Sequence, residues 1–401
     1  METVAVIAEF NPFHTGHAHL LREIRAHLGK ETAIAVIISG AFVQRGEPAI
    51  FDKWQRAAWA VRSGADAVVE LPAVYALSSA AGFAFGGVSL ASHLGCTYLA
   101  CGVERGTADD FLALARCAAA LPKGHPAQQQ GTAGQALSAA LSEAMPEKAS
   151  LLREPNALLA FEYAKAITTL PRPLTFLTLP RRGRHDAAEL GSVFASASAL
   201  RRVMTSSPDK SYLYIPYIPP ENRVSLKACL ERGTFTDYRR YEDFAACQGR
   251  LLTPVQLKAL PAFTEGLENR WHRVFAEACT YGEALAAIKT KRYAYSRLCR
   301  MGAYTLLQPT RTLMDQSYEE GPQYARLLAL NGRGAAFLHE KRGTFPVISK
   351  VRRDIKRLSP LGRNQLALDF RASDLQSLCF TAESARQGRQ DFYHSPLFLA
   401  P

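Results

Sequence analysis

The sequence lacks several features that would place it in familiar classes of protein. Its eight cysteines form no CxxC pair, which argues against zinc ribbons and thioredoxin-type redox motifs. Cysteines scattered through a chain of this size are typical of reduced thiols, so we expect a cytoplasmic protein. The first ten residues contain no basic segment of the kind that begins a signal peptide, and neither an internal repeat nor a long low-complexity tract is present.

One long stretch lacks charge altogether. From Leu71 to Val103 there is no Asp, Glu, Lys or Arg. The stretch is rich in Gly and Ser and contains Pro72, which makes it a poor candidate for a lipid span of about 20 apolar residues. We expect a helix of small residues packed on a sheet, and no contact with a membrane.

Acidic residues are scarce, because 36 Asp and Glu stand against 48 Lys and Arg in the 401 residues, a net charge of +12. Residues 270–360 alone hold 17 basic and 7 acidic side chains. Within them, Ile288–Arg300 carries five basic residues, two tyrosines and no acid, and Val351–Arg357 is a second basic cluster. Basic groups track phosphates and aromatic rings stack on unpaired bases, so this half favours an RNA partner over a merely solvated helix face.

The chain up to about residue 205 alternates short apolar runs with helical patterns. The strand-like runs cover residues 4–8, 33–38, 67–71, 97–102 and 171–180. Short buried strands between helices predict βαβ units, and so a Rossmann-like α/β fold with a parallel sheet. Further on the chain becomes loop-rich, then helical and basic. We therefore predict two domains, 1–205 and 206–401, with a further boundary near residue 260.

The first chemical motif, NPFHTGH, follows the first strand and precedes the first helix. Free N–H groups and the helix dipole at such a position favour an anion such as a phosphate. His14 and His17 fall on one face and could bind the charge that develops during attack on an α-phosphate. The alternatives are that they only cap the helix, or that they bind a metal together with His19 or Glu9. The HxGH pattern is the signature of the nucleotidyltransferase superfamily, which includes class I aminoacyl-tRNA synthetases.

The second motif, SGAFVQRGEP, follows the second strand, at the edge of an open α/β sheet where ligands bind. Gly40 and Gly46 allow close approach of the backbone. Arg45 could bind a phosphate or carboxylate through two hydrogen bonds. The alternative is an ordinary loop with a surface arginine.

Three later segments add candidate nucleotide contacts. Gly102 closes the fourth strand, where a nucleoside could pack on bare backbone, and Asn156 at a helix start could offer its amide; a plain strand-end glycine and a capping asparagine are the alternatives. A basic loop, RRGRHD, begins at Arg181. A serine-rich turn then enters a helix whose hydroxyls and Arg201 suit β- and γ-phosphates, unless it is only a capped helix with a solvated basic face.

Taken together, these segments resemble the tRNA(Met) cytidine acetate ligase family. The matching segments are Ala8–His17, Ser39–Ala49, Gly64–Pro72, Gly102–Glu104, Pro155–Tyr163 and Ser196–Arg201, with 268–270, 288–293 and 324–326 towards the C-terminus. The resemblance spans nearly the whole chain, and FVQRGEP and IKTKRY are far more specific than HxGH. Two departures stand out, since RRGRHD is shorter than the corresponding family stretch and SASALR replaces SATxIR.

The resemblance implies an enzyme that adenylates acetate with ATP. It then passes the acetyl group to the exocyclic amine of the wobble cytidine of elongator tRNA(Met), forming N4-acetylcytidine and releasing AMP and diphosphate. Residues 1–205 would be the nucleotidyltransferase-like domain that activates acetate, with Mg²⁺ shielding the triphosphate. Residues 206–401 would be the mainly helical region that binds tRNA.

The predicted site residues fall into three groups. His14 and His17 are the predicted catalytic residues. The resemblance implies ATP contacts at Ile7, Ala8, Glu9, Phe10, Asn11, Pro12, Phe13, His14, Thr15, Gly16, His17, Ala18, His19, Leu20, Gly102, Asn156, Arg181 and Arg182, and the serine-rich turn adds Ser196, Ser198 and Arg201. The predicted contacts to the other substrate or to RNA are Gly40, Gln44, Arg45, Lys289, Lys291, Arg292, Tyr293 and Arg297. No protein ligand to a metal is assigned.

Two other functions fit parts of this pattern. One is a small-molecule adenylyltransferase of the same fold, which would not need a long basic C-terminal extension. The other is a non-catalytic RNA-binding protein that retains a nucleotide fold, against which the intact His14, Gly16 and His17 argue.

Overall fold

The structure is a computed structural model that describes residues 2–121, 133–181, 196–290, 292–340, 343 and 345–400. Within these residues one eight-stranded sheet has the order β5-β4-β1-β2-β3-β6-β7, with β8 paired to β6. The strands are β1 (Thr3–Ala8), β2 (Ala33–Ser39), β3 (Ala67–Leu71), β4 (Tyr98–Val103), β5 (Thr175–Pro180), β6 (Ala325–Leu330), β7 (Val347–Ile348) and β8 (Leu397–Phe398). The first five are mutually parallel, so the predicted α/β fold with a parallel sheet is confirmed.

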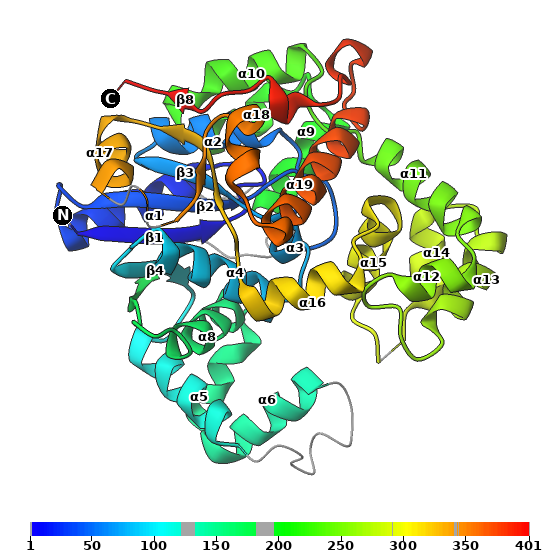
Figure 1. Cartoon of the computed structure of the whole chain (residues 1–401), viewed down its shortest axis with the longest axis horizontal. Helices are drawn as coiled ribbons and strands as arrows, with labels where there is room; N and C mark the ends of the chain where they lie inside the picture. The colour runs from blue at the N-terminus through cyan, green and yellow to red at the C-terminus, as the bar shows by residue number, and fades with distance from the viewer. Residues whose placement is uncertain are drawn as a thin grey trace.

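Both faces of the sheet are covered by helices, which is why the central strands are largely apolar rather than alternating. Val4 and Val6 of β1 face α1 (Thr15–Leu28) and α2 (Lys53–Arg62), whereas Ala5 and Ile7 face the opposite layer. That layer holds α4 (Ala80–His93), α5 (Ala108–Ala120) and α8 (Pro155–Thr168), below the sheet in Figure 1. The uncharged stretch after β3 forms the short α3 (Ala73–Ala76) and α4, as expected. Among the described helices, none has the length and apolar character needed to cross a membrane.

A separate group of helices lies to one side of the sheet (Figure 1). It consists of α11 (Tyr238–Leu251), α12 (Pro254–Ala259), α13 (Leu267–Glu277), α14 (Tyr281–Ile288) and α15 (Tyr295–Leu307). The other helices are α6 (Ala133–Ala144), α7 (Pro146–Ala149), α9 (Ala197–Ser206), α10 (Arg223–Glu231), α16 (Arg311–Glu320), α17 (Gly332–Glu340), α18 (Val351–Asp354) and α19 (Pro360–Leu378). Beyond residue 266 the chain is mainly helical, as the sequence predicts. The stretch from about 204 to 260 was expected to be rich in loops, but it contains α10, α11 and α12, because prolines such as Pro254 stand at the start of a helix and do not interrupt it.

The sheet does not end where the predicted first domain ends. β6 pairs antiparallel with β3, and β7 and β8 flank β6, so the sheet draws strands from both sides of the 205/206 boundary. Sequence periodicity could not show this, because a strand added beside a distant neighbour has the same local pattern as any buried apolar run. The assignment of ATP to residues 1–205 and of tRNA to residues 206–401 stays a prediction.

A buried cluster of charged side chains joins the strands and helices before residue 205 to those after it. Lys53 at the start of α2 lies 2.7 Å from Glu70 Oε2 on β3 and 2.8 Å from Asp391 Oδ1 near the C-terminus. Arg326 on β6 lies 3.5 Å from the same Asp391 oxygen. All four side chains are at most 2% exposed. A charge buried this deeply is stable only while its partners remain, so the cluster fastens the C-terminal segment to the sheet.

We expect Asp391→Asn to lower the free energy of unfolding by about 3–5 kcal/mol, because it leaves the two buried cations of the cluster, Lys53 and Arg326, with Glu70 as their one carboxylate within it. Denaturant unfolding followed by circular dichroism measures the change. Glu383→Gln is the control in the same C-terminal segment, because its carboxylate is 91% exposed, and it should shift stability by about 0.5 kcal/mol or less. Equal effects of the two substitutions would show that the cluster does not hold the segment.

Candidate active site

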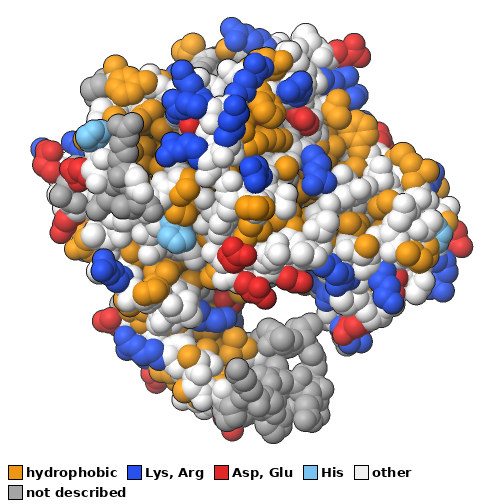
Figure 2. Space-filling view, in the orientation of Figure 1, with side chains coloured by type: hydrophobic (Ala, Val, Ile, Leu, Met, Phe, Trp, Pro, Cys, Tyr) orange, Lys and Arg blue, Asp and Glu red, His pale blue; other side chains and the backbone are white. Residues whose placement is uncertain are grey.

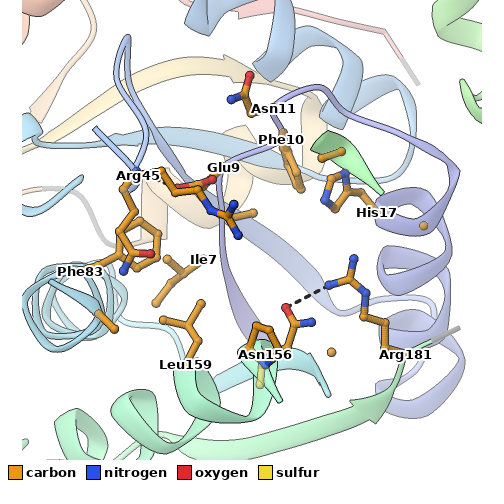
Figure 3. Close-up of a pocket in the computed structure, with 18 of the residues that line it drawn as sticks. Ile7, Glu9, Phe10, Asn11, His17, Arg45, Phe83, Asn156, Leu159 and Arg181 are labelled. Atoms are coloured by element: carbon orange, nitrogen blue, oxygen red, sulfur yellow. Dashed lines mark hydrogen bonds between the residues drawn. The ribbon is translucent and has the colours of Figure 1, made fainter. Parts of the chain in front are cut away.

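A cavity of about 780 Å³ opens at the carboxyl ends of β1, β4 and β5, where parallel sheets bind their ligands. Figure 3 shows side chains from the end of β1, the loop after β2, α4, α8 and the end of β5 converging on it. Most of the residues predicted from the N-terminal motifs line it: Ile7, Ala8, Glu9, Phe10, Asn11, His14, Gly16, His17, His19, Leu20, Gln44, Arg45, Gly102, Asn156, Arg181, Ser198 and Arg201. The structure therefore brings segments as far apart in the chain as Val6 and Arg300 into one concave site.

The two histidines form a pair at the start of α1. His14 is the N-cap, and its Nδ1 accepts the Gly16 N–H at 3.0 Å, while His17 Nδ1 accepts the His14 N–H at 3.3 Å. The rings stack with their centroids 3.8 Å apart. Since each Nδ1 is an acceptor, a neutral ring carries its proton on Nε2. The histidines do cap the helix, and that same cap fixes the tautomer in which Nε2–H is a donor.

His17 is held in its neutral form. Burial lowers its pKa well below the ordinary range, and the neighbouring His14 and Arg181 lower it further. The ring also lies against Phe10 and Phe13, with centroids 4.7 and 5.5 Å away. At neutral pH His17 is therefore a hydrogen-bond donor of fixed orientation rather than a cation.

One end of the cavity is built around Asn156 and Arg181. Arg181 Nη1 donates to Asn156 Oδ1 at 2.9 Å, the bond drawn in Figure 3, and the Asn156 amide nitrogen donates to Glu104. The N-cap of α8 is Glu154, so Asn156 is not the capping residue. A Cβ at Gly102 would meet Arg181 Cβ at 3.9 Å, which makes this position roomy rather than tightly packed. This end offers backbone at Gly102 and a fixed amide and guanidinium at the side.

The serine-rich turn supplies an arginine. Arg201 on α9 donates to the Asn11 carbonyl at 2.7 Å and forms a 3.0 Å ion pair with Glu47. Its Nη2 lies 3.5 Å from Ser198 Oγ. Ser196 is instead the N-cap of α9, is buried and does not line the cavity, so the capping interpretation applies to that serine.

The loop of the second motif forms the opposite end of the cavity. The Gln44 N–H donates to Glu9 Oε1 at 2.8 Å, and Glu9 and Arg45 lie near each other in Figure 3. Phe10, two residues after β1, has φ +50, so the chain turns directly after Glu9. Burial raises the pKa of Glu9, while the Gln44 N–H and the charge of Arg201 act to lower it. Glu9 and Arg45 thus line the cavity at the end away from Asn156 and Arg181.

The same loop is held against α15. Gly46 has φ +84, and a Cβ there would lie 2.4 Å from the Arg300 backbone nitrogen. The Tyr241 hydroxyl donates to the Gly46 carbonyl at 2.8 Å. Gly40 lies away from the cavity, because a Cβ at that position would lie 2.0 Å from Glu70 Oε1 in the buried charge cluster.

Several cavity residues were missed by sequence reasoning. From α15 come Tyr295, Ser296, Cys299 and Arg300; from the start of α4, Ser79, Ala80 and Phe83; and from α8, Leu158, Leu159 and Tyr163. The basic run Ile288–Arg300 was the one signal that pointed to α15, and it was interpreted as an RNA surface. Its contact with the second motif is long-range and leaves no local pattern.

The remaining predicted residues lie elsewhere. Pro12, Phe13, Thr15 and Ala18 support the first motif without lining the cavity. The basic-run residues Lys289, Arg292, Tyr293 and Arg297 also lie outside it. Arg297 donates to the Ala262 carbonyl at 2.9 Å, and Arg292 pairs with Glu265, so both side chains already have protein partners. Arg182 and Lys291 lie outside the described residues.

The alternative of a histidine metal site receives no support. In the part of the chain that the structure describes, no three or more His, Cys, Asp or Glu side chains are grouped so that they could hold a metal ion. Four arginines line the cavity, Arg45, Arg181, Arg201 and Arg300, against the three carboxylates of Glu9, Glu23 and Glu47, of which Glu47 is paired with Arg201. Such a site suits a polyanion better than a bare cation.

Comparison with known proteins assigns the family. Residues 1–391 match the model of the HIGH Nucleotidyl Transferase family. A tRNA(Met) cytidine acetate ligase of Leuconostoc citreum is 33% identical over 99% of this chain and 97% of its own length, and one of Latilactobacillus sakei is 36% identical over 88% of each. Crystal structures of Thermotoga maritima TmcAL, apo and bound with alpha-thio ATP, superpose with TM-scores of 0.94 and 0.92 at 27% identity over the whole of both chains. The chain therefore belongs to the HIGH nucleotidyl transferase family, among the tRNA(Met) cytidine acetate ligases.

Proposed function

We propose that this chain is an ATP-dependent ligase that acetylates the wobble cytidine of elongator tRNA(Met) through an acetyl-adenylate. The observation that carries the proposal is the pair of stacked histidines whose Nδ1 atoms are fixed by the cap of α1 inside a cavity rich in arginine. Family membership supports it, as does the crystal structure of Thermotoga maritima TmcAL with bound alpha-thio ATP. We place the enzyme in the cytoplasm, where its tRNA substrate would be.

The cavity can be divided by chemistry. The adenosine would lie over Gly102, beside Asn156 and Arg181, and the triphosphate would extend past the start of α1 towards Ser198 and Arg201. Acetate would bind at the opposite end, near Arg45. The assignments of the triphosphate and of acetate match an anion with a cation or an N–H donor, and the adenosine is placed where bare backbone and an amide are available.

Activation of acetate requires attack by its carboxylate oxygen on the α-phosphate, with diphosphate leaving. Negative charge grows on the phosphate oxygens during this step, and neutral Nε2–H donors of His14 and His17 would stabilise it. Arg201 would attract the departing diphosphate. Mg²⁺ would be bound mainly by the triphosphate and water, as is usual for this ion, since the described residues offer it no cluster of ligands. When bound it supplies charge neutralisation.

The cytosine amine is a poor nucleophile, because its lone pair is delocalised into the ring. The mixed anhydride compensates for this weak nucleophile by activating the acyl group. Positioning of the cytosine next to the acyl carbon lowers the barrier further. The base must leave its stack to enter the cavity. This explains why a nucleotide-activating site is linked to a basic C-terminal half.

The decisive experiment supplies protein, ATP, labelled acetate and tRNA transcripts, and analyses the tRNA as nucleosides. Label in N4-acetylcytidine of elongator tRNA(Met), absent without ATP, is the expected result. Acetate-independent transfer of AMP to a small molecule would instead identify a small-molecule adenylyltransferase. Binding of tRNA with no consumption of ATP would identify a non-catalytic RNA-binding protein.

One exposed basic cluster is a candidate tRNA contact. Figure 2 shows Lys and Arg side chains gathered over the region of α18, where Arg352, Lys356 and Arg357 are exposed. Arg353 is already bonded to Asp354 at 2.7 Å. The first three cations are therefore better suited to meet phosphates.

We expect the triple substitution Arg352→Ala, Lys356→Ala and Arg357→Ala to weaken tRNA binding and to flatten its salt dependence. Loss of three phosphate contacts should reduce the slope of log K against log salt by about 2–3. Fluorescence anisotropy with labelled tRNA at several salt concentrations measures the slope. Acetyl-adenylate formation without tRNA should stay unchanged, and an unaltered slope would remove α18 from the tRNA surface.

A further inference from the structure

The end of the cavity opposite Asn156 and Arg181 holds the carboxylate of Glu9, which the sequence predicts as an ATP contact and to which the activation of acetate gives no chemical task. Glu9 lies at the end of β1, lines the cavity and is half-buried. One of its oxygens is fixed, because Oε1 accepts the Gln44 N–H at 2.8 Å. Its backbone is fixed as well, because Arg56 Nη1 donates to the Glu9 carbonyl at 2.7 Å. Glu9 is therefore a rigidly placed acceptor at the wall of the site.

This end also faces the C-terminal half of the chain. Tyr295, at the start of α15, lines the same cavity and is 48% exposed, an unusual state for a large aromatic side chain. Arg45 and Phe83 flank Glu9 in Figure 3. An aromatic ring at the mouth suits a nucleobase entering from the side of the helical group, which would bring its amine towards Glu9.

Acetyl transfer needs a proton acceptor. When the cytosine amine attacks the acetyl carbonyl, a C–N bond forms, the bond from the carbonyl carbon to the phosphate oxygen breaks, and AMP leaves with that electron pair. The attacking nitrogen becomes strongly acidic and must give up one proton. A positioned carboxylate can accept it.

The other basic groups of the cavity are poorly suited to this task. His14 and His17 already accept backbone N–H groups on Nδ1 and carry their protons on Nε2. Glu47 is bound to Arg201 at 3.0 Å, and Glu23 lies 3.7 Å from His19 on α1. Glu9 is fixed by a neutral N–H donor instead of an ion pair. Burial raises the pKa of its carboxyl above the ordinary value, while the Gln44 N–H and the charges of Arg201 and Arg45 act to lower that pKa.

On the basis of the proposed function, we propose that Glu9 is the general base that removes the proton from the cytosine amine during acetyl transfer. The activation of acetate releases no proton from an amine, so that step needs no base at Glu9. The two half-reactions therefore depend on different residues of one cavity, the histidines for the first and Glu9 for the second.

The test separates the two half-reactions in Glu9→Gln, whose amide oxygen can still accept the Gln44 N–H. Acetyl-adenylate is measured without tRNA as acetohydroxamate formed with hydroxylamine, which is a good nucleophile without a base. Transfer is measured as the single-turnover rate of N4-acetylcytidine formation. We expect hydroxamate within about 3-fold of the unsubstituted enzyme and transfer slower by about 10²-fold or more.

Glu31→Gln, a carboxylate with its side chain 92% exposed, should change neither rate. Equal loss of both half-reactions in Glu9→Gln, or unchanged transfer, would overturn the role of Glu9. A transfer-specific loss in Glu47→Gln but not in Glu9→Gln would assign the base to Glu47. If the proposed function itself were wrong, the unsubstituted enzyme would form no acetate-dependent hydroxamate, which is a different result from any of these.

Discussion

Replacement of His17 by alanine is expected to slow acetyl-adenylate formation by about 10²–10³-fold, the usual cost of removing one donor to a developing oxyanion. The reason lies in the neutral Nε2–H, which the depressed pKa of His17 and the cap of α1 maintain at neutral pH. Acetate-dependent exchange of labelled diphosphate into ATP measures the step. Affinity for tRNA should be unchanged, because Lys289, Arg292 and Arg297 and the exposed cations around α18 lie outside the cavity.

Two further variants separate chemistry from folding. His17→Asn keeps an acceptor for the His14 N–H but has no group at the position of Nε2. Its exchange rate should therefore fall as far as that of His17→Ala, while the protein stays folded. His27→Ala, an exposed histidine on the same helix, should retain full activity. If tRNA affinity fell in parallel with exchange, the division of labour between the two halves would be wrong.

Gly46→Ala should be the most damaging substitution outside the nucleotide contacts. A Cβ at Gly46 would lie 2.4 Å from the Arg300 nitrogen and 2.5 Å from the Cys299 carbonyl carbon, and helix backbone cannot yield to it. The loop that carries Gln44 and Arg45 must shift instead. A shift of about 1 Å at a catalytic site costs on the order of 10²-fold in rate, which we expect in the overall acetylation assay.

A second glycine gives the matched control for the backbone angle alone. Gly266 has φ +81, close to the +84 of Gly46, but a Cβ there meets nothing within 4 Å. Gly266→Ala should therefore cost about 1 kcal/mol of stability from the left-handed conformation and leave the rate of acetylation unchanged. Similar activities for the two variants would contradict the proposed contact between the loop and α15.

The parts of the site that the sequence predicts are those coded by a continuous strand, turn and helix. His14 and His17 follow a buried strand and begin a helix, so their placement at the carboxyl edge of the sheet needs only local rules. The part contributed by α15 depends on a contact across about 250 residues, between Gly46 and Arg300. The spacing of apolar residues in the local sequence does not indicate a contact between residues so far apart. Arg297 illustrates the converse, because its positive charge predicts a phosphate contact while its guanidinium is bonded to the Ala262 carbonyl.

In the fold, too, local sequence predicts some elements while others depend on contacts between distant residues. The five parallel strands alternate with helices and were predicted, whereas β6 was not, because its antiparallel place beside β3 is decided by tertiary partners such as Glu70 and Arg326. Ser196 and Asn156 show how the alternatives are resolved. The first is a helix cap, and the second is a cavity residue bonded to Arg181.

The place of β6 beside β3 has a consequence for how the chain is made. The edge of β3 is complete once residue 71 has been synthesised, but its neighbour at residues 325–330 emerges some 250 residues later, or roughly 10–50 s at common translation rates. During that interval β3 is an open and largely apolar edge, the kind that pairs with other chains. A fragment ending at residue 205 should therefore aggregate rather than bind ATP, and the nascent chain is a natural client for chaperones.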